Sequence, residues 1–279
     1  GWVARNRATL ISRRIYPLVF VWHTDARSTL AGAIEDLARA HRAAGLFDRA
    51  KDYLRERLDD LIEPAARAAG VKTLWDEIKE NGLGASDQGG AARVAAEALA
   101  DLSRRRGPPI ELHLAAHSAG SIFLAPTIAL LDELGAATGA ARWARPRVAS
   151  CSLWAPACTV DLFRATYLPA VEDDLLDRLA VFVLDDETER RDTVGPAYHK
   201  SVLYLVSNAL ERRLRRPGER NGVPLLGMQV FAEREQVFGR ADARLIVAPG
   251  PGSGADSHTA FDDDGATRRS TTDFILGPA

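Results

Sequence analysis

A serine lies at a sharp turn between an apolar run and a helical pattern. Residues 110–124 read IELHLAAHSAGSIFL, with Ser118 between the small residues Ala116 and Gly120. Small neighbours permit a tight turn that exposes a hydroxyl, and a helix start behind it favours negative charge. A serine hydroxyl needs such help to act as a nucleophile. The pattern predicts a nucleophile elbow, although Ala116 replaces the usual first glycine. The alternative is an ordinary turn serine that caps a helix.

A serine nucleophile requires a base, and one histidine is well placed for that role. His258 lies in a glycine-rich loop that follows the last apolar strand-type run, residues 243–248. A base that follows the nucleophile and the acid along the chain fits the order serine, aspartate, histidine. We therefore predict that His258 takes the proton of Ser118.

The acid that orients such a histidine is expected after an intermediate strand. The strand-type run 179–184 leads into a polar loop, residues 185–196, that contains Asp185, Asp186 and Asp192. Asp192 is the predicted acid, because it begins the sequence DTVGP and an aspartate followed by valine and proline commonly precedes the helix after such a loop. Asp186 is the alternative acid, and an aspartate not used in this way solvates or caps the loop.

Strand-type runs alternate with helical periodicity, which predicts one α/β domain over residues 1–279 with a mostly parallel sheet flanked by helices. We expect five strands, in residues 18–22, 110–117, 148–154, 179–184 and 243–248. Residues 198–216 are expected to form one amphipathic helix. No strand can be placed between residues 26 and 109, so we expect a helical insertion or lid over residues 26–86, before the nucleophile strand.

The AHSAG sequence around Ser118, the loop 185–196 and His258 together resemble the α/β-hydrolase superfamily. The resemblance implies acyl transfer: attack by Ser118, proton transfer through His258, an acyl-enzyme and then hydrolysis by water. It implies a small-molecule carboxylic ester or thioester as substrate and no cofactor. It also implies that the backbone N–H of Ala119 is one oxyanion donor.

A second oxyanion donor usually comes from a loop after an earlier strand. His23 and Thr24, followed by Asp25, lie at the end of the run 18–22 and are one candidate source. The other is a segment that would precede Gly1. His117, next to the nucleophile, is expected to border the oxyanion site or the pocket.

Composition excludes several classes of protein. The chain has 279 residues, 46% hydrophobic and 27% charged, with a net charge of −2, which gives no argument for nucleic-acid binding. Neither a membrane-length apolar run nor a signal peptide is visible, so we expect a cytoplasmic protein. The two cysteines, Cys151 and Cys158, are expected to be small buried hydrophobes. The oligomeric state stays open.

Two other hypotheses compete with the hydrolase. The first is a non-catalytic scaffold of the same fold that binds a partner or a small molecule, because fold does not guarantee function. The second is a metal site made by His258 with Asp256 and the run Asp262–Asp264. Consecutive aspartates at a helix start are better explained by capping and solvation, so we predict no metal.

Overall fold

A computed structural model describes most of the chain: residues 2–21, 32–33, 36, 62–68, 70–106, 110–137, 147–194, 198–216 and 219–277. Four strands form one sheet: β1 (Glu111–His117), β2 (Arg147–Trp154), β3 (Leu179–Leu184) and β4 (Ala243–Ala248). They are ordered β1-β2-β3-β4, and each neighbouring pair is parallel. Every residue of β3 is buried, as expected for an apolar strand covered on both faces. The predicted parallel sheet flanked by helices is confirmed.

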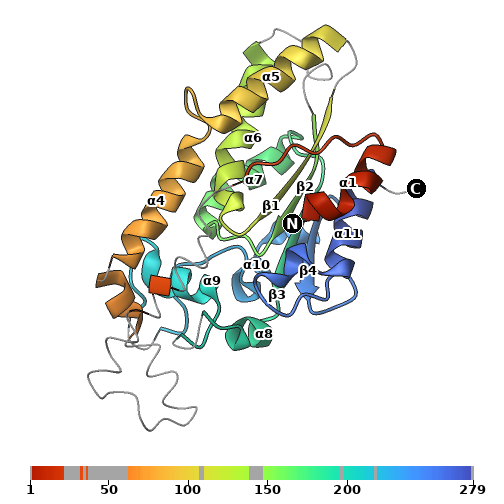
Figure 1. Cartoon of the computed structure of the whole chain (residues 1–279). Helices are drawn as coiled ribbons and strands as arrows, with labels where there is room; N and C mark the ends of the chain where they lie inside the picture. The colour runs from red at the N-terminus through yellow and green to blue at the C-terminus, as the bar shows by residue number, and fades with distance from the viewer. Residues whose placement is uncertain are drawn as a thin grey trace.

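Helices surround this sheet and supply most of the core. Figure 1 shows α6 and α7 on one side of the strands, and α11 with α1 on the other. Consistent right-handed crossovers place successive connecting helices on one face. The described residues include the helical elements α1 (Trp2–Ser12), α4 (Val71–Gly84), α5 (Ala91–Arg106), α6 (Gly120–Ala137), α7 (Val160–Glu172), α8 (Asp186–Arg191), α9 (Val202–Leu205), the π-helix η2 (Val206–Leu210), α10 (Gln229–Ala232), the 3₁₀-helices η3 (Gln236–Gly239) and η4 (Ala260–Asp262), and α11 (Gly265–Leu276).

The parallel arrangement gathers the predicted site residues at one edge of the sheet. Ser118 directly follows β1, Asp192 ends the short helix after β3, and His258 lies in the loop after β4. The carboxyl ends of parallel strands meet at the same edge, which is where ligands bind in open α/β sheets. The sheet topology therefore brings together loops that are far apart in the sequence.

The predicted strand over residues 18–22 is wrong for the part that the structure describes. Leu18 to Val21 form no strand, and these apolar side chains are between 44% and 70% exposed. A strand requires a partner with which to share backbone hydrogen bonds, and this segment is not paired with the sheet. The described residues therefore contain four strands, and not the expected five.

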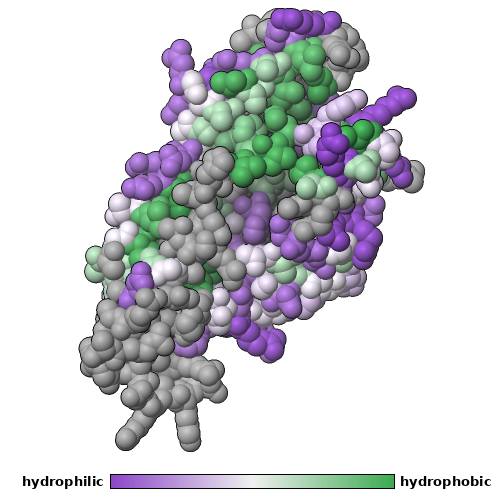
Figure 2. All heavy atoms as spheres, viewed as in Figure 1, coloured by the Kyte–Doolittle hydropathy of each residue, from purple (hydrophilic) through white to green (hydrophobic). Residues whose placement is uncertain are grey.

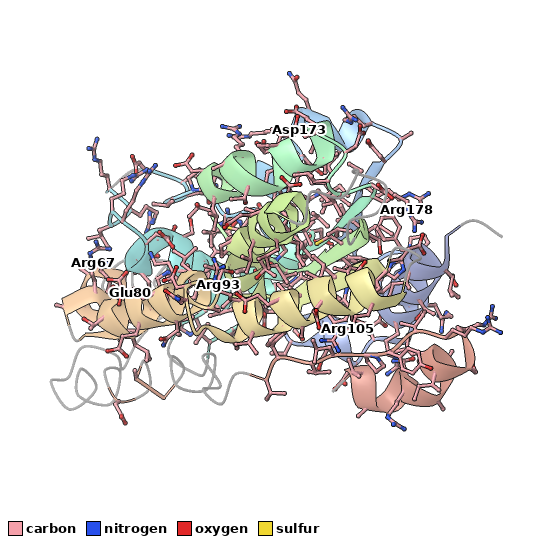
Figure 3. The ribbon with its side chains drawn as sticks, turned by 90° about the horizontal axis from the view of Figure 1, so that it is seen from above. Arg67, Glu80, Arg93, Arg105, Asp173 and Arg178 are labelled. Atoms are coloured by element: carbon pink, nitrogen blue, oxygen red, sulfur yellow. The ribbon has the colours of Figure 1, made fainter. Side chains whose placement is uncertain are left out.

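The single helix predicted over residues 198–216 is also wrong. Helical structure covers only α9 and η2, and the backbone becomes extended at Glu211. Arg67 supplies the physical reason, because its guanidinium donates hydrogen bonds to the carbonyl oxygens of Ala209 and Glu211. Helix-end carbonyls that are satisfied by a side chain need no further turn. Figure 3 labels this arginine at the end of the molecule where residues 62–68 lie.

The described part of the expected insertion, residues 62–68 and α4, packs firmly on the body of the protein. Helix α4 contacts α6 and η2, and it lies roughly end to end with α5 (Figure 1). The indole of Trp75 donates a hydrogen bond of 2.9 Å to the carboxylate of Glu211. Most of residues 26–61 lie outside the described residues, so the role of this insertion as a lid stays a prediction. None of the described helices is long and apolar enough to cross a membrane.

Candidate active site

Ser118 adopts the strained backbone conformation of a tight turn. Its φ angle is +54°, in the left-handed region that residues other than glycine rarely adopt. The Ser118 N–H donates to the carbonyl of Trp154 at 2.9 Å, and its own carbonyl accepts the Ala157 N–H at 3.1 Å. The adjacent strand β2 and its exit therefore hold the turn in place. Such strain persists only where its surroundings fix it, and it is frequent at functional sites.

A buried hydrogen-bond network behind the turn was not anticipated from the sequence. The Ser121 hydroxyl donates to the Ser118 carbonyl at 2.7 Å and accepts the Cys158 N–H at 3.0 Å. The Tyr167 hydroxyl donates to the Ser121 carbonyl at 2.6 Å. Burial raises the pKa of Tyr167 well above its usual value, so the phenol stays protonated as a donor. The one sequence signal for this network is a second serine three residues after the first.

The two cysteines are buried and form no disulfide, as predicted. Burial raises the pKa of the Cys158 thiol to about 12, and it raises that of Cys151 further. The thiolate is the reactive form of cysteine, so neither side chain competes with Ser118 as a nucleophile at neutral pH.

His258 lies within hydrogen-bond distance of the candidate nucleophile. Its Nε2 atom is 2.9 Å from Oγ of Ser118, and only 2% of the residue is exposed. The main-chain N–H of His258 donates to Oδ2 of Asp192 at 2.8 Å. The structure thus brings together the three residues that the sequence singled out, from the ends of β1, α8 and β4.

The other two aspartates of the same loop are engaged elsewhere. Asp185 caps α8 by accepting the N–H of Thr188 at 2.7 Å. Asp186 accepts hydrogen bonds from Tyr204 and Arg190. Burial raises the pKa of Asp186, but these hydrogen bonds and the nearby arginine charges outweigh it, so the net shift is downward. Asp186, the alternative acid, is thus held as a structural anion, whereas Asp192 contacts His258.

His117 and Ala119 flank Ser118 and differ in their surroundings. The Nε2 atom of His117 lies 2.8 Å from the carbonyl oxygen of His258, and the two imidazole rings are 5.0 Å apart. Ala119 is buried directly before the first turn of α6, where backbone N–H groups concentrate positive potential. His23, Thr24 and Asp25 lie outside the described residues, so their predicted role stays untested.

A large cavity borders the turn. It has a volume of about 2110 Å³ and is lined by β1, the first turn of α6, α5 and the extended segment 15–21. His117 and Gly120, which lie on either side of the Ser118–Ala119 turn, are among its lining residues. Phe20 packs against Phe123 across it, with ring centroids 4.9 Å apart. Figure 2 shows a broad apolar surface over this part of the molecule.

The alternative metal site is not assembled in the described part of the chain. There, no group of three or more histidine, cysteine, aspartate or glutamate side chains is placed to hold a metal ion. Asp264 instead caps α11, since its Oδ2 atom accepts the N–H groups of Thr267 at 2.6 Å and Gly254 at 2.9 Å. Capping is the role that the sequence favoured for this run of aspartates.

Comparison with known protein families, with curated proteins and with solved structures gives no match. The geometry of these residues is therefore the basis for assigning a function.

Proposed function

We propose that the chain is a serine hydrolase of the α/β-hydrolase type that cleaves a carboxylic ester or thioester. The observation that carries the proposal is the 2.9 Å separation between Ser118 Oγ and His258 Nε2, at a residue whose φ angle is +54°. A nucleophile and a base within hydrogen-bond reach are two of the parts that covalent acyl transfer requires, and we propose Asp192, which accepts the main-chain N–H of the same histidine, as the third.

The chemistry follows from that arrangement. The Ser118 Oγ atom attacks the carbonyl carbon of the substrate while His258 Nε2 accepts the hydroxyl proton. The tetrahedral oxyanion collapses, the alkoxide or thiolate leaves, and the imidazolium returns the proton to it. Water then attacks the acyl-enzyme, again with His258 as the base, to release the carboxylic acid and restore the Ser118 hydroxyl.

The oxyanion needs donors that are fixed before the reaction. The Ser118 N–H is committed to the Trp154 carbonyl, so it is not available for this role. The N–H of Ala119, at the start of α6, is the donor that we propose, since a helix N-terminus stabilises negative charge. A second donor from His23 or Thr24 remains part of the hypothesis.

The neighbouring cavity supports an apolar acyl group. Its walls include Ala116, Phe123 and Leu124, and it reaches the residues on both sides of the Ser118 turn. Burial of each methylene of an acyl chain contributes about 0.8 kcal/mol, so binding there would favour longer chains. Rates measured on p-nitrophenyl acetate, butyrate and octanoate test this substrate class, and a rate that falls with chain length would contradict it.

The decisive experiment is intact mass spectrometry after treatment with a fluorophosphonate, on wild type and on Ser118→Ala. A single adduct on wild type that is absent from the variant would establish an activated serine at this position. The absence of an adduct on the folded wild-type chain would contradict the proposal and favour a non-catalytic scaffold. Circular dichroism of both proteins confirms that they are folded.

A further inference from the structure

We infer that His117 is a positioning residue that holds the catalytic base against the nucleophile. The inference rests on the proposed function and adds to it the residue that fixes the distance between Ser118 and His258. It depends on the 2.8 Å contact between His117 Nε2 and the carbonyl oxygen of His258. A carbonyl oxygen can only accept a hydrogen bond, so His117 donates from Nε2 and is in the tautomer with a hydrogen there.

The topology of the sheet explains why His258 needs a hydrogen bond that holds it near Ser118. His258 belongs to the loop after β4, but Ser118 follows β1 at the opposite edge of the sheet. Three strand spacings, roughly 14 Å, separate these two strands. The loop must cross the ends of β3 and β2 to bring the imidazole to the serine. A loop that spans such a distance keeps a reactive geometry only where its end is held.

Two hydrogen bonds hold the main chain of His258, one at its N–H and one at its carbonyl. Asp192 Oδ2 accepts its N–H at 2.8 Å, and His117 Nε2–H donates to its carbonyl at 2.8 Å. The first contact comes from the segment after β3 and the second from the strand that carries the nucleophile. His117 directly precedes Ser118, so it ties the base to the backbone that positions the serine.

His117 is itself rigidly placed, so it can hold the His258 carbonyl in a fixed position. It is the last residue of β1, where it is paired with Trp154 of β2. The next residue, Ser118, donates its N–H to the Trp154 carbonyl at 2.9 Å. A hydrogen-bond donor on a strand is more accurately positioned than one on a loop. This accuracy matters because a displacement of the reacting groups by about 1 Å can reduce a rate about 100-fold.

Three variants test the inference through the rate of fluorophosphonate labelling. His117→Phe keeps a ring but removes the donor, and the maximal labelling rate should fall by about 10-fold to 100-fold with little change in inhibitor affinity. His117→Gln places an amide N–H at a similar reach and should restore most of the rate. A purely structural role would not distinguish these two variants in this way.

Ser150→Ala is the matched control. Ser150 lies on β2, and its Oγ atom is 2.8 Å from Nδ1 of His113 on β1, so the substitution also removes a side-chain contact of β1, but one away from His258 and outside the cavity lining. It should reduce stability without slowing the labelling. Equal loss of rate in Ser150→Ala and His117→Phe would mean that damage to β1, and not loss of the contact between His117 and His258, causes the effect.

The outcomes separate the inference from the proposed function. If wild type forms no adduct, the proposed function fails and the inference fails with it. If wild type reacts and His117→Phe reacts equally fast, the inference alone is overturned. A ¹⁵N-detected spectrum of the His117 ring gives a readout independent of activity: hydrogen on Nε2 is expected, and a neutral ring with hydrogen only on Nδ1 would contradict the tie.

Discussion

Gly120 and Ala116 face each other so closely across the turn that a Cβ atom on Gly120 would lie 3.2 Å from the Cβ of Ala116. The turn has room for one methyl group at this point, and Ala116 occupies it. This accounts for alanine at the first small position of the turn: Gly120 supplies the space. The departure from the usual glycine at residue 116 is therefore compatible with a tight elbow.

Gly120→Ala is predicted to destabilise the fold by about 1–3 kcal/mol, the usual cost of overpacking. It should also slow fluorophosphonate labelling, because the crowding displaces the residues that flank Ser118. The double variant Ala116→Gly with Gly120→Ala moves the methyl group to the other side and should recover most of both losses. Urea denaturation and labelling rates measure these effects; a single variant as stable as wild type would contradict the steric argument.

The two aspartates that border α8 are predicted to differ sharply. Asp192→Asn keeps an oxygen that can accept the main-chain N–H of His258 but removes a negative charge that favours the imidazolium, so the hydrolytic rate should fall, by about 10-fold for each 1.4 kcal/mol of imidazolium stabilisation that is lost. Asp186→Asn should leave that rate near wild type, because Asp186 is engaged with Tyr204 and Arg190. Equal, mild losses in the two variants would remove Asp192 from the mechanism.

Glu189, inside α8, is predicted to make stability fall as pH rises. Burial, together with nearby carboxylates that include Asp192, raises its pKa from 4.5 to about 8. Between these values the unfolded chain has lost the proton and the folded chain keeps it. The free energy of unfolding should therefore decrease by up to about 1.4 kcal/mol for each pH unit in that window, and level off above it.

Glu189→Gln tests this pH dependence. The amide keeps an oxygen to accept the hydrogen bond from Ser201 but does not ionise, so the fall in stability between pH 4.5 and about 8 should flatten. Urea denaturation at pH 5, 6, 7 and 8 measures both slopes. Parallel slopes for wild type and variant would show that Glu189 does not titrate as its burial implies. The Asp186 carboxylate makes the opposite contribution to the pH dependence of stability, because its pKa is lowered in the folded protein. It stabilises the fold at neutral pH, and that stabilisation is lost as the pH falls through the lowered pKa. Asp186→Asn should remove this loss on acidification.

Local pattern was sufficient for the elements that position the site. The boundaries of β3 and β4 were predicted as they are observed, because each is a short apolar run of the kind buried in a parallel sheet. The order of Ser118, Asp192 and His258 along the chain was informative because parallel strands end at one edge. No local pattern could reveal the contact between His117 and His258, which are 141 residues apart.

Predictions from the sequence failed where contacts with residues far away in the chain determine the local structure. Residues 198–216 have helical periodicity, but Arg67 satisfies the carbonyls at the end of η2 and the helix stops. Residues 18–21 are apolar and rich in β-forming side chains, yet strand formation also depends on an available partner. The support of the turn by Ser121 and Tyr167 likewise joins residues that only the folded core brings together.

A buried carboxylate attaches residues 62–68 to the body of the protein. Glu63, only 2% exposed, accepts hydrogen bonds from Arg215, Asn208 and Tyr198. Burial raises the pKa of Glu63, and the Arg215 charge opposes that shift. Glu63→Gln leaves the Arg215 guanidinium without its counter-charge in a buried site, so the variant should lose about 3–5 kcal/mol of stability.

Two further variants establish that burial causes this loss. Arg105→Ala breaks an ion pair with Asp101 whose side chains are 75% and 42% exposed (Figure 3 labels Arg105), and it should change stability by less than about 1 kcal/mol. Arg215→Met added to Glu63→Gln removes the stranded charge and should recover part of the loss. If Glu63→Gln and Arg105→Ala were equally mild in urea denaturation, residues 62–68 would not be anchored by this charge pair. The expected large difference would instead show that Glu63 anchors this segment, in addition to the hydrogen bonds that Arg67 donates to Ala209 and Glu211.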